Sequence, residues 1–155
     1  MTALHKLLTG QGAHARAEHI LEGLESEDFG ARIDGSPHTV FDELWHLVYW
    51  QDLILDWIAG KERGSPARAA ESWPNERRLD AHTTQGLVEA FLGGIDRAVA
   101  IASDEGGLDR QVRGSSTVRT LLESLLAHNS HHLGKILLLR QLLGRWPPPS
   151  GGDTW

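Results

Sequence analysis

The stretch from residue 39 to residue 60, TVFDELWHLVYWQDLILDWIAG, decides the fold class. Its apolar side chains surround most of a helical cylinder, which predicts a deeply buried helix over residues 40–59. Thr39 can cap the first turn, and the acidic Asp42 and Glu43 suit that end of a helix. Gly60 is typical of the residue that follows a helix C-terminus. This region therefore predicts a helix in the interior of an α-helical protein.

Three further segments show helical periodicity, and no segment alternates with period two. The first covers residues 4–24, although Gly10 and Gly12 weaken it by about 1 kcal/mol each. The next begins near Thr83 or Thr84 and ends before residue 106. The last begins after residues 115 and 116 and ends at residue 143, before a glycine and the prolines at 147–149. Four helices of about 20 residues predict an all-α four-helix bundle.

The remaining segments are a polar connection and a short tail. The connection, residues 61–82, is too long for a bare link in a compact domain, so we expect it to hold a short helix or cover a site. Residues 146–155 predict an extended tail of a single domain that covers residues 1–155. Of the six tryptophans, Trp45, Trp50 and Trp57 have the spacing of core residues. Trp146 and Trp155 are better candidates for packing the tail on the bundle or for contacting a second copy of the chain.

Composition excludes several classes of function. The 155 residues carry 15 Lys and Arg against 21 Asp and Glu, a net charge of −6, with no basic run, which argues against nucleic-acid binding. Without cysteine the chain can form neither disulfides nor thiolate zinc sites, and it has no cysteine nucleophile. No apolar run reaches the roughly 18 residues of a membrane span, and the N-terminus does not resemble a signal peptide. We expect a cytoplasmic protein.

Three of the nine histidines lie in apolar helical segments. His128 and His132 are four residues apart, so they share one helix face, and His46 lies on the buried helix quoted above. A buried neutral imidazole needs partners for both ring nitrogens, and one divalent metal could satisfy all three rings. Hydrogen-bonded core histidines explain the pattern equally well at this point. His131 ranks second as a ligand because it points about 60° away from the other two.

The residues around these histidines exclude one class of metalloenzyme. The segment His128-Asn129-Ser130-His131-His132 has an amide where an H-E-x-x-H peptidase has its glutamate base, and an amide cannot take that proton. No general acid or base stands out. The polar residues nearest to the histidines in sequence, each of which also fits a surface or supporting role, are Asp42, Glu43, Gln51 and Asn129.

Two blocks resemble the DinB/YfiT-like metal-dependent proteins. They are residues 44–48, LWHLV, and residues 128–136, HNSHHLGKI, and the C-terminal Trp-Pro-Pro-Pro and Gly-Gly-Asp-Thr-Trp are similar as well. The resemblance implies an up-down-down-up four-helix bundle with a long connection between its second and third helices. It also implies one divalent metal on His46, His128 and His132, and a homodimer.

Family activities, where known, are mostly transfers of a small thiol, so the resemblance implies a metal-dependent thiol transferase acting on an electrophilic small molecule. Three imidazoles leave coordination positions open, as catalytic metal sites do. A hydrolase that uses metal-bound water and a non-enzymatic metal- or ligand-binding stress protein are the alternatives. Nickel, zinc, iron and manganese all accept imidazole, so the sequence leaves the metal open.

Overall fold

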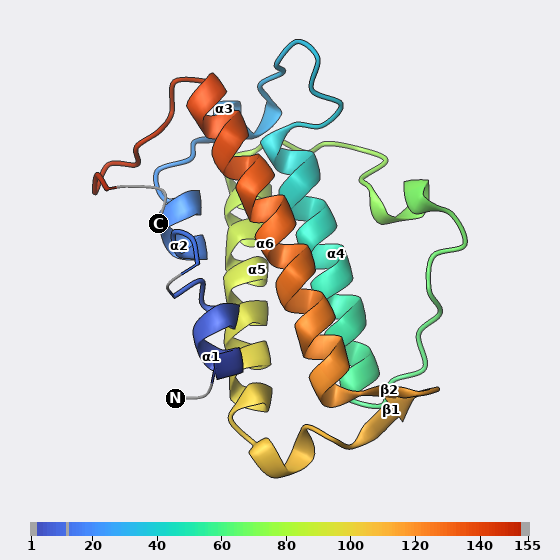
Figure 1. The fold of residues 1–155 in the computed structure, drawn as a ribbon. Coiled ribbons are helices and arrows are strands. Elements are labelled where there is room, and N and C mark those ends of the chain that lie inside the picture. Colours follow the sequence, from blue (N-terminus) through green and yellow to red (C-terminus); the bar gives the residue numbers. More distant parts are fainter. Residues whose placement is uncertain (1–2, 12, 153–155) are drawn as a thin grey trace.

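The computed structural model describes residues 3–11 and 13–152, so Gly12 and Trp155 lie outside the described residues. The protein is mostly helical and has one two-stranded sheet in its described part, which confirms the all-α class (Figure 1). In chain order the elements are α1 (Ala3–Leu8), α2 (Ala17–Leu21), α3 (Ser26–Gly30), α4 (Val40–Ile58), η1 (Ala69–Ser72), α5 (Ala81–Ala102), η2 (Glu105–Gly107), β1 (Gln111–Arg113), β2 (Ser116–Thr117) and α6 (Val118–Leu142).

Three long helices, α4, α5 and α6, form the body of the molecule. Both α5 and α6 pack on α4, and α6 runs in the direction opposite to the other two (Figure 1). Thr39 and Asp42 close a capping box at the start of α4, and Gly60 follows its end with a φ of 80°. Gly144 follows α6 in the same way, with a φ of 70°. These boundaries agree with those predicted from the sequence. Helix α5 begins slightly earlier than predicted, with Asp80 as its cap.

The predicted helix over residues 4–24 is wrong. The chain forms the short helices α1 and α2 there, followed by α3, and glycines with positive φ lie between them. Gly10 has a φ of 76° and Gly23 a φ of 68°, values that a right-handed helix cannot contain. Helices α1 and α2 pack beside α5 and α6, so this broken segment still covers the apolar faces of two long helices.

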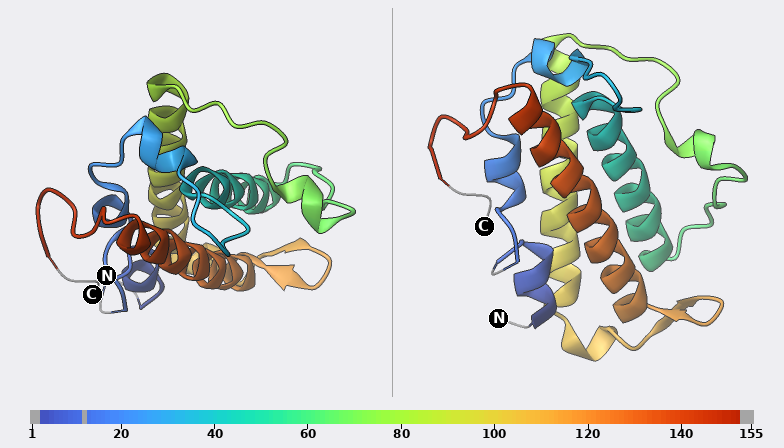
Figure 2. Two further views of the ribbon diagram at one scale, coloured as in Figure 1. Left: turned by 90° about the horizontal axis from the view of Figure 1, so that it is seen from above. Right: turned by 45° about the horizontal axis from the view of Figure 1, so that its top comes forward.

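The second departure from the sequence prediction is the small hairpin of β1 and β2 before α6. The connection between α4 and α5 holds the 3-10 helix η1, as predicted, and runs outside the long helices on the side of α4 (Figure 2). The tail up to residue 152 is not helical, and Ser150 donates a hydrogen bond to Glu22. No described helix combines the length and the apolar character needed to cross a membrane.

The apolar core falls into two clusters along the long helices. The first cluster includes Ile20, Phe29, Leu44, Leu47, Phe91, Leu133 and Ile136. The second cluster includes Ile54, Ile58, Ala98, Ala102, Leu122 and Leu125. On α6, Leu125 ends the second cluster and Leu133 begins the first. His128, Asn129 and His132 fall in this gap, so a polar belt crosses the α4–α6 interface between two apolar clusters.

Candidate metal centre

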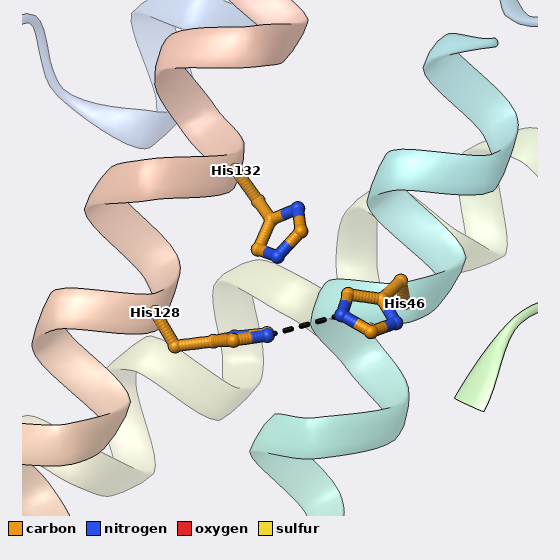
Figure 3. A group of neighbouring side chains, drawn as sticks. All are labelled: His46, His128 and His132. Atoms are coloured by element: carbon orange, nitrogen blue, oxygen red, sulfur yellow. Dashed lines mark hydrogen bonds between the residues drawn. The ribbon is translucent and has the colours of Figure 1, made fainter. Parts of the chain in front are cut away.

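Three imidazole rings from two helices converge at this belt. His46 comes from α4, and His128 and His132 come from successive turns of α6 (Figure 3). Each ring offers a nitrogen, and the three nitrogens lie within 4.8 Å of one another. The Nε2 atoms of His46 and His128 are 3.1 Å apart. That is close to the spacing of about 3.4 Å that two nitrogens have around a tetrahedral ion with bonds of about 2.1 Å.

Two of the rings donate a hydrogen bond from Nδ1 to an acceptor outside the cluster, and this bond fixes the tautomer of each ring. His46 Nδ1 donates to the backbone carbonyl of Ser72 at 2.7 Å. His132 Nδ1 donates to the Glu43 carboxylate at 2.5 Å, and the Glu43 side chain is only 3% exposed. A neutral imidazole that donates from Nδ1 keeps its lone pair on Nε2. Both Nε2 lone pairs therefore point at the centre of the cluster, as in histidines that bind a metal.

The third ring, His128, is less well satisfied by the protein. Its Nε2 can donate to His46 Nε2, but its buried Nδ1 has no hydrogen-bond partner among the described residues. A cation at the centre would instead accept lone pairs from all three Nε2 atoms and leave His128 Nδ1 as a donor. The buried amide oxygen of Asn129, the next residue, likewise has no partner in the described part of the chain.

The electrostatic environment keeps two of these rings neutral. Burial lowers the pKa of His128 to about 3, and the neighbouring His132 and His46 add to this effect. Burial also lowers the pKa of His46, because the Ser72 carbonyl only partly offsets the loss of hydration. A metal binds the neutral form of imidazole, so no proton on these two rings competes with it near neutral pH.

The other residues near the histidines in sequence have different partners. Asp42 accepts a bidentate ion pair from Arg77, at 2.7 and 2.9 Å, beside its role in the capping box. Asn129 donates to Gln51, and Gln51 donates to the Phe91 carbonyl at 2.9 Å. Of the four polar residues considered, Glu43 is the one that accepts a hydrogen bond from His132.

His131 does not join the cluster. Its side chain is exposed, and its ring meets His132 only edge-on. This agrees with its lower rank as a ligand.

Two aromatic rings contact the cluster: Trp50, which lies four residues after His46 on the same helix face, and Trp73, which the sequence did not indicate. Trp73 stacks on His46, with ring centroids 4.0 Å apart and an angle of 11° between the planes. Trp50 lies against His46 and His128, with centroids 6.4 and 6.1 Å away. The three tryptophans predicted as core residues are all half-buried: Trp50 lies at this site, and Trp45 and Trp57 pack against the two core clusters.

Fold and site thus define a helical protein whose interior carries three convergent imidazoles. The model of the DinB superfamily matches residues 11–136, a range that includes all three histidines. The chain belongs to the DinB superfamily. No curated protein and no solved structure matches it significantly.

Proposed function

We propose that this protein binds one divalent metal through His46, His128 and His132 and is a metal-dependent transferase of a small thiol. The observation that supports the metal site is the convergence of the ring nitrogens. In His46 and His132, Nδ1 is turned away and donates to a fixed acceptor. Membership of the DinB superfamily supports the same ligand set. The transfer of a thiol rests on the family resemblance alone.

A divalent metal on three imidazoles would lower the pKa of a coordinated thiol, so that the nucleophilic thiolate is available near neutral pH. The protein's own part is to hold the rings and limit water. Glu43 and the Ser72 carbonyl orient His132 and His46, while Trp73 covers one face of the His46 ring and Trp50 meets that ring edge to face. In the transfer, a sulfur–carbon bond replaces the bond to a leaving group, which departs with its electron pair, and the thiol proton passes to solvent.

The bundle topology is part of this proposal. The opposite direction of α6 to α4 and α5 is compatible with an up-down-down-up four-helix bundle, in which α1 and α2 take the place of the first helix. The connection from α4 to α5 would then be the long one between the second and third helices. A homodimer is expected from the resemblance.

The metal site is tested by metal content per chain, measured by plasma mass spectrometry on protein purified without a metal-affinity tag. We expect close to one divalent metal in the wild type and in His131→Ala, whose ring is exposed and outside the cluster. We expect almost none in His46→Ala or in the double variant His128→Ala/His132→Ala. A folded wild type that takes up neither Zn²⁺ nor Ni²⁺ contradicts the proposal.

The reaction is tested by turnover of a small thiol with an electrophile such as a chlorodinitrobenzene, in loaded protein and after removal of the metal. Loss of turnover with the metal and its return on reloading support the transferase. Metal-dependent cleavage of an ester without added thiol would instead favour a hydrolase. A loaded protein without either activity would favour a binding protein.

A further inference from the structure

The connection between α4 and α5 reaches the histidine cluster at His46. We call residues 61–80 the strap. Its residues up to position 71 are almost all exposed, yet Ser72 is only 2% exposed. The Ser72 carbonyl accepts the hydrogen bond from His46 Nδ1, and Trp73 stacks on the same imidazole. A largely solvated segment thus buries its one fully enclosed residue directly behind a candidate metal ligand.

Trp73 is itself held between two rings. His38, from the segment before α4, stacks on its other face, with centroids 3.7 Å apart and nearly parallel planes. The order His38–Trp73–His46 makes a three-ring stack. An indole fixed on both faces leaves the His46 imidazole little freedom to rotate about its χ2 angle, so the stack and the Ser72 carbonyl restrain the same ring.

A second contact fastens the strap to α4 close to this stack. The Arg77 guanidinium binds both carboxylate oxygens of Asp42, whose side chain is 1% exposed. Asp42 lies four residues before His46 and therefore on the same face of α4. The ion pair thus holds the strap one helical turn from the ring that Ser72 and Trp73 contact.

We infer that Trp73 is a positioning residue for His46, that it keeps Nε2 of that ring directed at the metal centre, and that Arg77 fastens the strap that carries it. The metal part of this inference rests on the proposed function. The orientation of the His46 ring does not, because it is argued from protein contacts alone, the Ser72 carbonyl and the Trp73 ring. A residue behind a metal ligand typically changes metal affinity 10- to 100-fold when it is replaced.

The test uses four variants of the full chain. Trp73→Leu removes the stacked ring and keeps an apolar side chain, and Trp73→Phe restores an aromatic ring. Arg77→Met removes the ion pair that fastens the strap. Arg97→Met is the matched control, because Arg97 of α5 makes an exposed ion pair with Asp52 of α4, the helix that also carries Asp42, and the strap is not involved.

Two measurements are made on each variant. The first is the affinity for Zn²⁺, from competition with a chromophoric chelator. We expect Trp73→Leu to bind Zn²⁺ about 10- to 100-fold more weakly, Trp73→Phe to recover most of this loss, Arg77→Met to lose several-fold, and Arg97→Met to match the wild type. The second is the tautomer of His46 in metal-free protein, from long-range ¹H–¹⁵N correlation spectra. We expect one Nδ1-protonated form in the wild type and a mixture of tautomers in Trp73→Leu.

Full Zn²⁺ affinity together with a single tautomer in Trp73→Leu would overturn the inference. So would an equal loss in Arg77→Met and Arg97→Met, since that would report a general loss of stability. If Trp73→Leu does not fold, Arg77→Met still decides: a several-fold loss of Zn²⁺ affinity in Arg77→Met but not in Arg97→Met supports the inference, and wild-type affinity in both overturns it. A wild type that binds no Zn²⁺ would overturn the proposed function, and the tautomer spectra would still decide the positioning role.

Discussion

Two polar layers cross the α4–α6 interface side by side, and they differ in where their nitrogen atoms are directed. The amide layer, Gln51 and Asn129, is linked by its own hydrogen bonds to the Phe91 carbonyl on α5. The histidine layer, His46, His128 and His132, turns two Nδ1 donors outward and leaves lone pairs facing one another. A buried layer whose amide N–H groups donate to protein oxygens links the helices, whereas one whose ring nitrogens converge, with His128 Nδ1 left without a partner in the described chain, is suited to a cation.

The largest expected effect comes from breaking the histidine layer with His128→Leu. We expect Zn²⁺ affinity to fall more than about 100-fold. This loss is larger than the roughly 10- to 100-fold loss that follows from replacing a residue that supports a ligand. The metal-free chain should keep its free energy of unfolding within about 1 kcal/mol, because loss of the hydrogen bond from His128 Nε2 to His46 is offset by removal of a buried Nδ1 that has no partner in the described chain. Chelator competition and urea unfolding measure the two quantities. Retention of one tightly bound metal would contradict the assignment.

The second largest effect is expected on stability, when Gly94→Ala on α5 disturbs the amide layer. Gly94 of α5 faces Gln51, and a Cβ there would lie 1.8 Å from Gln51 Nε2. Displacing a fully buried amide should lower the free energy of unfolding of the metal-free chain by about 3 kcal/mol, from overpacking and a lost hydrogen bond. Urea unfolding checks this.

Gly93→Ala is the matched control for that change. Its Cβ would meet nothing within 4 Å, so helix propensity alone predicts a gain in stability of up to about 1 kcal/mol. The Zn²⁺ affinity of the folded protein should stay within about threefold of the wild type in both variants, because the ligands lie in the other layer. Equal effects of the two glycine substitutions on stability would contradict the tight fit of Gln51.

Local chemistry explains why sequence predicted part of this molecule well. Thr39 with Asp42, and the glycines after α4 and α6, act within a few residues of the boundaries that they set, so their effect is visible in the chain. The broken N-terminal segment was missed because its apolar spacing fits one helix. Gly10 and Gly23, both at positive φ, allow three short pieces to cover the same surface.

The same distinction applies to the residues of the site: sequence spacing predicts some of them, and only the folded structure shows the others. The spacing of His128 and His132 is a local signal, and the structure brings His46 to them as predicted. Sequence spacing does not predict the contacts of the residues that support the imidazole rings. Glu43 and His132 are 89 positions apart, and Trp73 lies in a polar connection with no periodicity. Only the packing of the strap and of α6 against α4 brings them to the imidazoles.

A smaller effect on the histidine layer is expected from Glu43→Gln. The carboxylate accepts a hydrogen bond from His132 Nδ1, and this bond makes His132 a stronger metal ligand. The same carboxylate lies 3.7 Å from Lys135. A neutral amide keeps the shape but accepts less strongly, and we expect Zn²⁺ affinity to fall about 10-fold. Chelator competition measures it, with the exposed Glu123→Gln on α6 as control. An unchanged affinity in Glu43→Gln would show that Glu43 is only a structural partner of the ring.

The smallest effect is the pH dependence of the ion pair beside the histidine layer. Burial opposes the ionisation of Asp42, but Arg77 and the Thr39 backbone N–H outweigh it and lower the pKa of Asp42 from 3.8. A carboxyl whose pKa is lower in the folded state stabilises the protein above its unfolded pKa, and this contribution is lost as pH falls through the folded value.

Asp42→Asn keeps the capping oxygen and removes the charge. At pH 7 we therefore expect it to lower the free energy of unfolding by about 1 kcal/mol, and the difference should shrink as the pH falls below 3.8 toward the lowered pKa of Asp42. Urea unfolding of both proteins across this range measures it. A difference that persists unchanged in acid would show that the carboxylate charge does not hold the strap, and that the histidine layer depends on Trp73 and Ser72 alone.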